Sequence, residues 1–245
     1  MYHDSHQSRD NLPPPEVGTS PGTEDDKKGP EEWIDDFCPL SMDDYLDSDP
    51  VDNHGDASFT GVWTAAKGLM DYLRRQQQQP KTILELGAGT GWMGITIGRN
   101  LSSIRHMVLT DSNHTGAVQW TRRNVAAALQ QGLPGMERIE TVALDWNDKD
   151  CQQVTSLHEF DWILGSDLIY SEDRVRPLAK TIAILLAKQP QARFLYGHTQ
   201  GRMSEVDLLW EQELKAHGLM WEVQATVPQW GDQRTVIMEI GRTKC

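Results

Sequence analysis

Short apolar runs alternate with longer, helix-periodic segments along most of this chain, and this alternation limits the folds open to it. The helical spacing is cleanest at Val175, Leu178, Ile182 and Leu185, which recur every three or four residues. Regular alternation of strand and helix predicts a doubly wound parallel sheet. The predicted strands cover residues 82–86, 106–110, 139–144, 160–165 and 193–197, and the predicted helices between them cover 92–101, 117–130, 172–188 and 203–217.

The segments at either end of this pattern complete the predicted domain. An apolar helical face runs from Val62 to Leu73, and we expect that helix to end in the glutamines 76–79, before Pro80. Residues 219–227 and 235–240 read as a closing hairpin with its turn at 229–231. The predicted fold class is therefore α/β, a mostly parallel, seven-strand, Rossmann-like sheet with a C-terminal antiparallel hairpin.

The first 58 residues differ in composition from the rest. They hold 16 acidic and 3 basic side chains, which accounts for the whole formal charge of −13, and residues 59–245 are neutral. We predict an acidic, largely disordered arm over 1–58, because its proline-rich and charged start has too little apolar surface to bury. Isolated hydrophobic residues among carboxylates at 31–56 fit a solvated linker or a docking segment for a basic partner.

The distribution of charged residues and cysteines limits which partners and which cellular compartment we expect for this protein. A neutral domain lacks the Lys/Arg excess that binds phosphate backbones, so we expect no nucleic-acid partner. The longest apolar run, 182–187, is far shorter than a membrane helix, and no basic-then-apolar stretch opens the sequence. Cys38, Cys151 and Cys245 show neither metal-ligand nor disulfide spacing. We expect no metal site, reduced thiols, and a cytosolic or nuclear protein whose oligomeric state stays open.

A glycine-rich turn follows the first predicted strand. Two registers are present: Gly89, Gly91 and Gly94 fit the dinucleotide pattern G-x-G-x-x-G, whereas counting from Gly87 gives G-x-G-x-G directly after the strand. The first glycine of such a turn should follow the strand at once, which favours Gly87. Glu85 beside the turn would repel a pyrophosphate and would suit S-adenosylmethionine, which carries an ammonium and a sulfonium.

Acidic and aromatic residues follow the next two predicted strands. Asp111 lies 22 residues after Gly89, where an acid binds ribose hydroxyls, although an acid here is also typical of a helix start. Asp145 and Trp146 offer a carboxylate for an adenine amino group and a flat face for its ring. A partly buried structural tryptophan is the alternative.

The fourth predicted strand leads into Ser166, Asp167 and Tyr170. A carboxylate at the end of a buried strand is poorly explained by packing, since an unpaired buried charge is costly. Capping of the helix that begins near Glu172 is the alternative.

Three sequence blocks together resemble the class I, seven-strand S-adenosylmethionine-dependent methyltransferases, and more narrowly methyltransferase family 16. They are VWTAA at residues 62–66 leading to Tyr72 and Leu73, LELGAGTG at 84–91, and DLIY at 167–170, which is similar to the family's D-x-x-Y signature. The resemblance spans about residues 61–199 and, loosely, the hairpin. Family members mostly methylate lysines of other proteins, so it implies a protein-lysine methyltransferase with a lysine-bearing protein as substrate.

The resemblance also implies roles for individual residues. Asp167 and Tyr170 would face the substrate as the catalytic residues, with Asp167 capturing and orienting the incoming ammonium. Ser166 departs from the expected alanine, and the N-P-P-Y-type loop of enzymes that methylate nucleic-acid bases is absent. Together with the strand-end reasoning above, the expected cofactor-binding residues are Trp63, Glu85, Gly87, Ala88, Gly89, Gly91, Asp111, Asp145, Trp146 and Ser166.

Two other functions stay open on the sequence. One is a nicotinamide-dependent oxidoreductase that uses the register of Gly89, Gly91 and Gly94, against which Glu85 and the absence of a separate substrate domain argue. The other is a non-catalytic adaptor that keeps the cofactor fold and binds a partner through residues 31–56.

In the favoured methyltransferase interpretation, a neutral lysine amine attacks the methyl carbon in line. The lysine ammonium, whose ordinary pKa is about 10.4, must first lose a proton.

Overall fold

The computed structural model describes residues 33–34, 63–147, 154, 156–201, 203–228 and 234–243. Everything below concerns the second of the chain's two units, residues 32–245. The predicted acidic arm, apart from Trp33 and Ile34, lies outside the described residues, as do the predicted domain start near Phe59 and the hairpin turn at 229–231.

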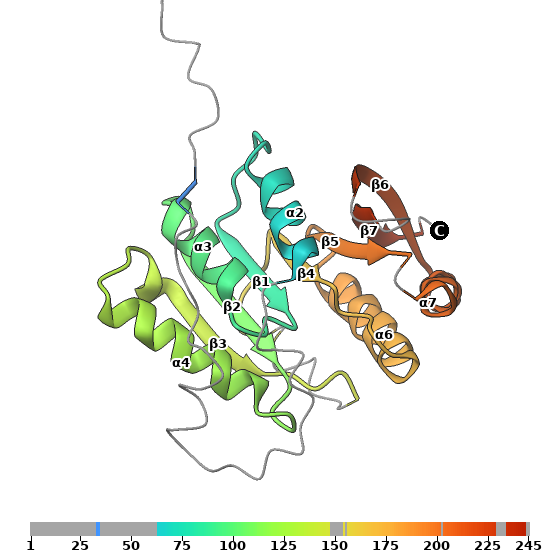
Figure 1. Cartoon of the computed structure of the whole chain (residues 1–245), viewed down its shortest axis with the longest axis horizontal. Helices are drawn as coiled ribbons and strands as arrows, with labels where there is room; N and C mark the ends of the chain where they lie inside the picture. Colours follow the sequence, from blue (N-terminus) through green and yellow to red (C-terminus); the bar gives the residue numbers. More distant parts are fainter. Residues whose placement is uncertain are drawn as a thin grey trace, which may run out of the picture. The chain divides into compact units, whose positions relative to one another are not determined.

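Seven strands form one sheet in the order β3-β2-β1-β4-β5-β7-β6, which confirms the predicted fold class (Figure 1). The five strands from β3 to β5 are parallel, and β7 pairs antiparallel with both β5 and β6. Their bounds are β1 Thr82–Leu86, β2 His106–Asp111, β3 Ile139–Ala143, β4 Trp162–Ser166, β5 Arg193–Gln200, β6 Leu219–Pro228 and β7 Arg234–Arg242.

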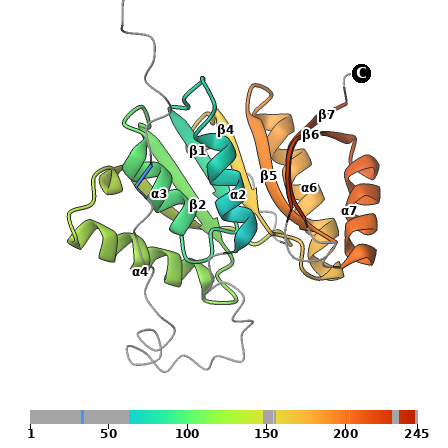
Figure 2. The ribbon, with the colours of Figure 1, turned by 45° about the horizontal axis from the view of Figure 1, so that its top comes forward.

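Helices cover both faces of the sheet (Figure 2). Along β4, Ile163 packs into the core on the α6 and α7 face, whereas its neighbours Trp162 and Leu164 pack into the core on the α2 and α3 face. This alternation is what a strand buried on both sides requires. The helices are α2 Thr64–Leu73, α3 Trp92–Asn100, α4 Ala117–Gln130, the short 3₁₀ helix η3 Met136–Arg138, α6 Glu172–Lys188 and α7 Ser204–Ala216. No helix within the described ranges combines the length and apolarity needed to span a bilayer.

Most predicted elements are confirmed to within a few residues, and the differences have physical causes. Helix α2 ends at Leu73, the last buried apolar residue of its face, because the polar residues up to Gln79 have nothing to pack against. Strand β5 continues three residues beyond Gly197, because β7 goes on pairing with it as far as Gln200. Strand β4 begins at Trp162, two residues later than predicted.

One contact from the acidic segment reaches the folded domain. The backbone of Ile34 exchanges two hydrogen bonds of 2.8 Å with the side-chain amide of Asn100, at the end of α3. Trp33 packs against the core on that face of the sheet. This contact, which no sequence pattern indicates, joins residues 66 positions apart.

Candidate functional site

The carboxyl ends of β1, β2, β3 and β4 open into one cavity of about 240 Å³. Parallel strands bring the residues that follow them to the same edge of the sheet, so side chains far apart in sequence meet here. Gly91 is the one predicted site residue that does not line the cavity. The eleven that do are Trp63, Glu85, Gly87, Ala88, Gly89, Asp111, Asp145, Trp146, Ser166, Asp167 and Tyr170.

The glycine turn has the backbone conformation that its sequence predicts. Gly87, Gly89 and Gly91 have φ of 59°, 54° and 73°, a left-handed conformation that favours glycine. Gly87 directly follows β1, and a Cβ atom there would lie 2.5 Å from Leu168 Cδ2. Gly94 is a helical residue of α3 instead, where a Cβ would collide with Leu109. The turn therefore starts at Gly87, and the third glycine of the dinucleotide register serves helix packing.

Glu85 places a buried carboxylate at the floor of the cavity. Its side chain lies on a central strand with only 2% of the residue exposed, and Oε2 has no hydrogen-bond partner. Burial, with the nearby charge of Asp111, raises the pKa of Glu85 to about 8, and the Gly94 N–H offsets part of this rise. A buried acid with one oxygen unpartnered suits a ligand that brings its own positive charge.

Asp111 is the last residue of β2 rather than the residue after it. Its Oδ2 accepts a 2.7 Å hydrogen bond from Gly89 N–H, and Oδ1 accepts one of 2.7 Å from Ser112 N–H. Burial raises the pKa of Asp111 despite these bonds. Helix α4 starts six residues later behind Gly116, so Asp111 is not a helix cap. It fixes the glycine turn and keeps further lone pairs toward the cavity.

Asp145 and Trp146 follow β3. Asp145 accepts hydrogen bonds from Asn147 N–H at 2.9 Å and from the Ser112 hydroxyl at 3.0 Å. Burial pulls the pKa of Asp145 upward, but these bonds outweigh it and hold the pKa below its usual range. Trp146 packs against the core, as the structural alternative expects, and it also lines the cavity.

Asp167 has a constrained backbone and a constrained side chain. It is the one non-glycine residue in the described ranges with a positive φ, 47°. Thr199 on β5 donates to both carboxylate oxygens, from its N–H at 2.7 Å and from its hydroxyl at 2.8 Å. Helix α6 begins behind Ser171, so Asp167 does not cap it. The carboxylate lines the cavity with its orientation fixed from behind.

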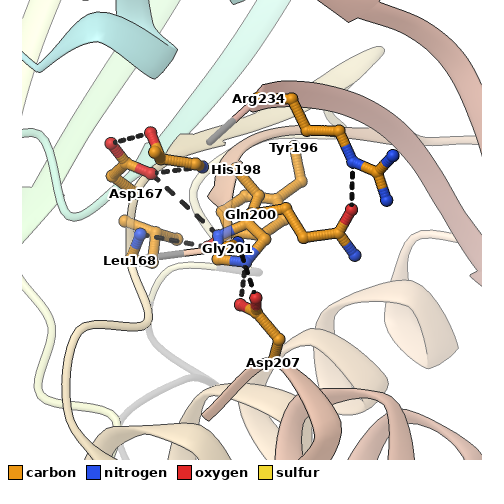
Figure 3. A network of polar contacts seen from close by, with 9 residues as sticks. Asp167, Leu168, Tyr196, His198, Gln200, Gly201, Asp207 and Arg234 are labelled. Carbon is orange, nitrogen blue, oxygen red and sulfur yellow. Dashed lines mark hydrogen bonds and ion pairs between the residues drawn. The ribbon is translucent and has the colours of Figure 1, made fainter. Parts of the chain in front are cut away.

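A second buried pair lies behind Asp167. His198 Nε2 on β5 is 2.6 Å from Asp207 Oδ1 on α7, and His198 Nδ1 is 4.0 Å from Asp167 Oδ1 (Figure 3). Asp207 also accepts a 2.9 Å hydrogen bond from Gly201 N–H. Tyr196 stacks on the His198 ring and accepts a hydrogen bond of 3.1 Å from Leu168 N–H. This network joins the loop after β4 to β5 and α7.

We expect Asp207→Ala to lower the free energy of unfolding by about 1–3 kcal/mol, because it leaves a buried imidazole N–H without its acceptor. Urea unfolding of the full chain measures this, with the exposed Asp173→Ala as a control that should change little. Equal stability of the two variants would show that the pair does not hold the network together.

Sequence reasoning did not find Thr199, His198, Asp207 or Arg174. Arg174, on the first turn of α6, lines the cavity, and its guanidinium carbon lies 5.6 Å above the centre of the Tyr170 ring. Its place on the first turn of the helix that follows Tyr170 is the only signal that could have indicated it. No three His, Cys, Asp or Glu side chains in the described part of the chain are arranged to hold a metal ion.

Comparisons with known proteins agree with this geometry. A family model described as "Lysine methyltransferase" matches residues 51–215. EEF1A lysine methyltransferase 3 of Xenopus tropicalis is 32% identical over 130 residues, covering 52% of this chain and 53% of that protein. Protein N-lysine methyltransferase METTL21A of the same organism is 29% identical, with 52% and 55% covered. The chain thus spans about half the length of these relatives.

Two solved structures share the fold. A putative methyltransferase, SMU.776, complexed with SAH, has a TM-score of 0.52 at 10% identity, covering 74% of this chain and 50% of that one. The N-terminal domain of EvdMO1 with SAH bound has a TM-score of 0.50 at 14% identity, with 78% and 85% covered. At these identities the likeness concerns the fold alone.

Proposed function

Because the chain belongs to the lysine methyltransferase family, methyltransferase family 16, we propose that it transfers a methyl group from S-adenosylmethionine to a lysine side chain of a protein. The observation that carries the proposal is the cavity at the strand ends, which is lined by the buried carboxylate of Glu85 and by the left-handed glycine turn that starts at Gly87. Curated relatives named as protein-lysine methyltransferases support the acceptor class.

The residues that line the cavity suit each part of S-adenosylmethionine, from its adenine to its amino-acid group. Asp145 and Trp146 would hold the adenine, Asp111 the ribose hydroxyls, and Glu85 the ammonium, with Trp63, Ser166 and the backbone of 87–89 enclosing the rest. When bound, S-adenosylmethionine supplies a methyl group activated by a sulfonium. A diphosphate is disfavoured in the same place, since four carboxylates line the cavity: Glu85, Asp111, Asp145 and Asp167.

On the acceptor side, we assign Asp167 to receiving the lysine amine. Its oxygens already accept from Thr199, and their remaining lone pairs can accept from an ammonium without a change of rotamer. This preorganisation is worth more than strong base strength, because alignment is the main requirement of an in-line transfer. Tyr170 would form a wall of the amine channel beside Arg174.

The proposal is tested by incubating the full chain with cell lysate and radiolabelled S-adenosylmethionine, followed by mass spectrometry of the labelled band. We expect one or a few labelled polypeptides that carry methyl-lysine, and loss of the label with excess S-adenosylhomocysteine. Label found only on arginine, or on nucleic acid, would contradict the proposed acceptor.

A further inference from the structure

The proposed donor carries a carboxylate at its amino-acid end, and burying an anion without a partner is costly. Of the described residues that line the cavity, Arg174 alone has a positively charged side chain. It is 26% exposed, and its ion pair is a long one of 3.7 Å with Asp173, which is 79% exposed. An arginine placed this way can exchange a weak surface partner for a ligand carboxylate.

The strand order indicates which end of the donor lies near Arg174. The adenine and ribose residues, Asp145 and Asp111, come from β3 and β2, at one side of the cavity. The next strands along the sheet are β1 and β4. Arg174 lies on α6, which follows β4, so the amino-acid end of the donor extends toward it.

Glu85 is placed to bind the other charged group of the donor's amino-acid end, the ammonium. Its carboxylate lines the cavity from β1, beside β4 in the sheet, and would bind the ammonium of the same amino-acid group. Arg174 itself lines the cavity, and its positive charge contributes to lowering the pKa of Asp111 against the rise caused by burial. The ammonium of the donor's amino-acid group would thus lie near the carboxylate of Glu85, and its carboxylate near the guanidinium of Arg174.

We propose that Arg174 binds the carboxylate of the methyl donor and makes the site selective for donors that carry one. This inference rests on the proposed function, since it assigns one more contact to the same cofactor. It also gives Arg174 a reason to lie over the Tyr170 ring, since both residues line the same cavity.

The test is calorimetric titration of the full chain with two probes, S-adenosylmethionine and decarboxylated S-adenosylmethionine, which lacks only the carboxylate. We expect the wild type to prefer the complete donor about 10- to 100-fold, the gain of one hydrogen-bonded charge pair. Arg174→Gln should lose this preference by weakening the complete donor while leaving the decarboxylated one unchanged. Arg174→Lys should keep part of it, as a cation without the guanidinium fork.

Arg176→Gln is the matched control, because it removes the same charge from the same helix turn. Arg176 is 76% exposed and pairs with Glu213 outside the cavity. Its variant should bind both probes as the wild type does. Unchanged preference in Arg174→Gln, or equal weakening of both probes, would overturn the inference. A wild type that binds neither probe would instead refute the proposed function.

Discussion

Replacing Asp167 with asparagine is expected to lower methyl transfer about 100-fold while leaving donor affinity and fold intact. Asparagine tolerates the left-handed backbone at φ 47°. Its carbonyl oxygen can accept from Thr199 N–H, and its amide can donate to the Thr199 hydroxyl, so the contacts to β5 persist. What the variant loses is the negative charge that the incoming ammonium would meet.

Rates are measured with the labelled polypeptide from the lysate experiment, and donor affinity by calorimetry. The control is Asp71→Asn, the same chemical change at an exposed position on α2 that does not line the cavity. If Asp167→Asn turns over at a near-wild-type rate while binding donor and unfolding normally, the role given to Asp167 is wrong.

Glu85→Gln is expected to stabilise the cofactor-free chain in alkaline solution. The pKa of Glu85 is raised from 4.5 to about 8, chiefly by burial, so the folded state keeps a proton that the unfolded state has released. The free energy of unfolding therefore falls by about 1.4 kcal/mol per pH unit as the pH rises from 4.5 to 8, and it is constant above pH 8. Glutamine removes this loss, so the variant should gain about 5 kcal/mol over the wild type at pH 9. Urea unfolding at pH 5 and pH 9 measures the difference, and equal gains at both would exclude the buried charge as its cause.

The same substitution should have the opposite effect on donor binding. A bound ammonium stabilises the ionised form of Glu85, so binding releases a proton wherever the empty site is protonated. Affinity for S-adenosylmethionine should rise up to tenfold per pH unit toward pH 8 and fall above it, because the donor's own α-ammonium, with an ordinary pKa of about 8, then loses its proton. Glu85→Gln should remove the rise and weaken binding about 10- to 100-fold at pH 8. The exposed Glu137→Gln is the control and should keep the slope; a slope that survives in Glu85→Gln would assign it to another group.

The sheet could be predicted because local patterns determine it. The run from Thr82 to Leu86 is short, apolar at three of its five positions and followed at once by Gly87, and its bounds agree with β1 to the residue. The ends of β5 and α2 depend on the segments that pair or pack beside them. For example, β7 pairs with β5 as far as Gln200, and no local sequence pattern predicts this.

The residues of the candidate site also fall into two groups, those that the sequence predicts and those that only tertiary packing brings together. Glu85, Asp111 and Asp145 were predictable because they lie at or next to the ends of parallel strands, which topology brings together. Thr199 and Asp207 come from a strand and a helix later in the chain, and they matter through hydrogen bonds whose partners only tertiary packing selects. A threonine or an aspartate there looks in sequence like any strand end or helix start.

The central claim is that a cationic methyl donor, rather than a dinucleotide, fills the cavity. Titration calorimetry of the full chain at pH 8 with S-adenosylmethionine, S-adenosylhomocysteine and NADH tests it most directly. Saturable one-to-one heat with the first two and none with NADH is the predicted result. Tight binding of NADH, with no heat from either sulfur compound, would contradict it.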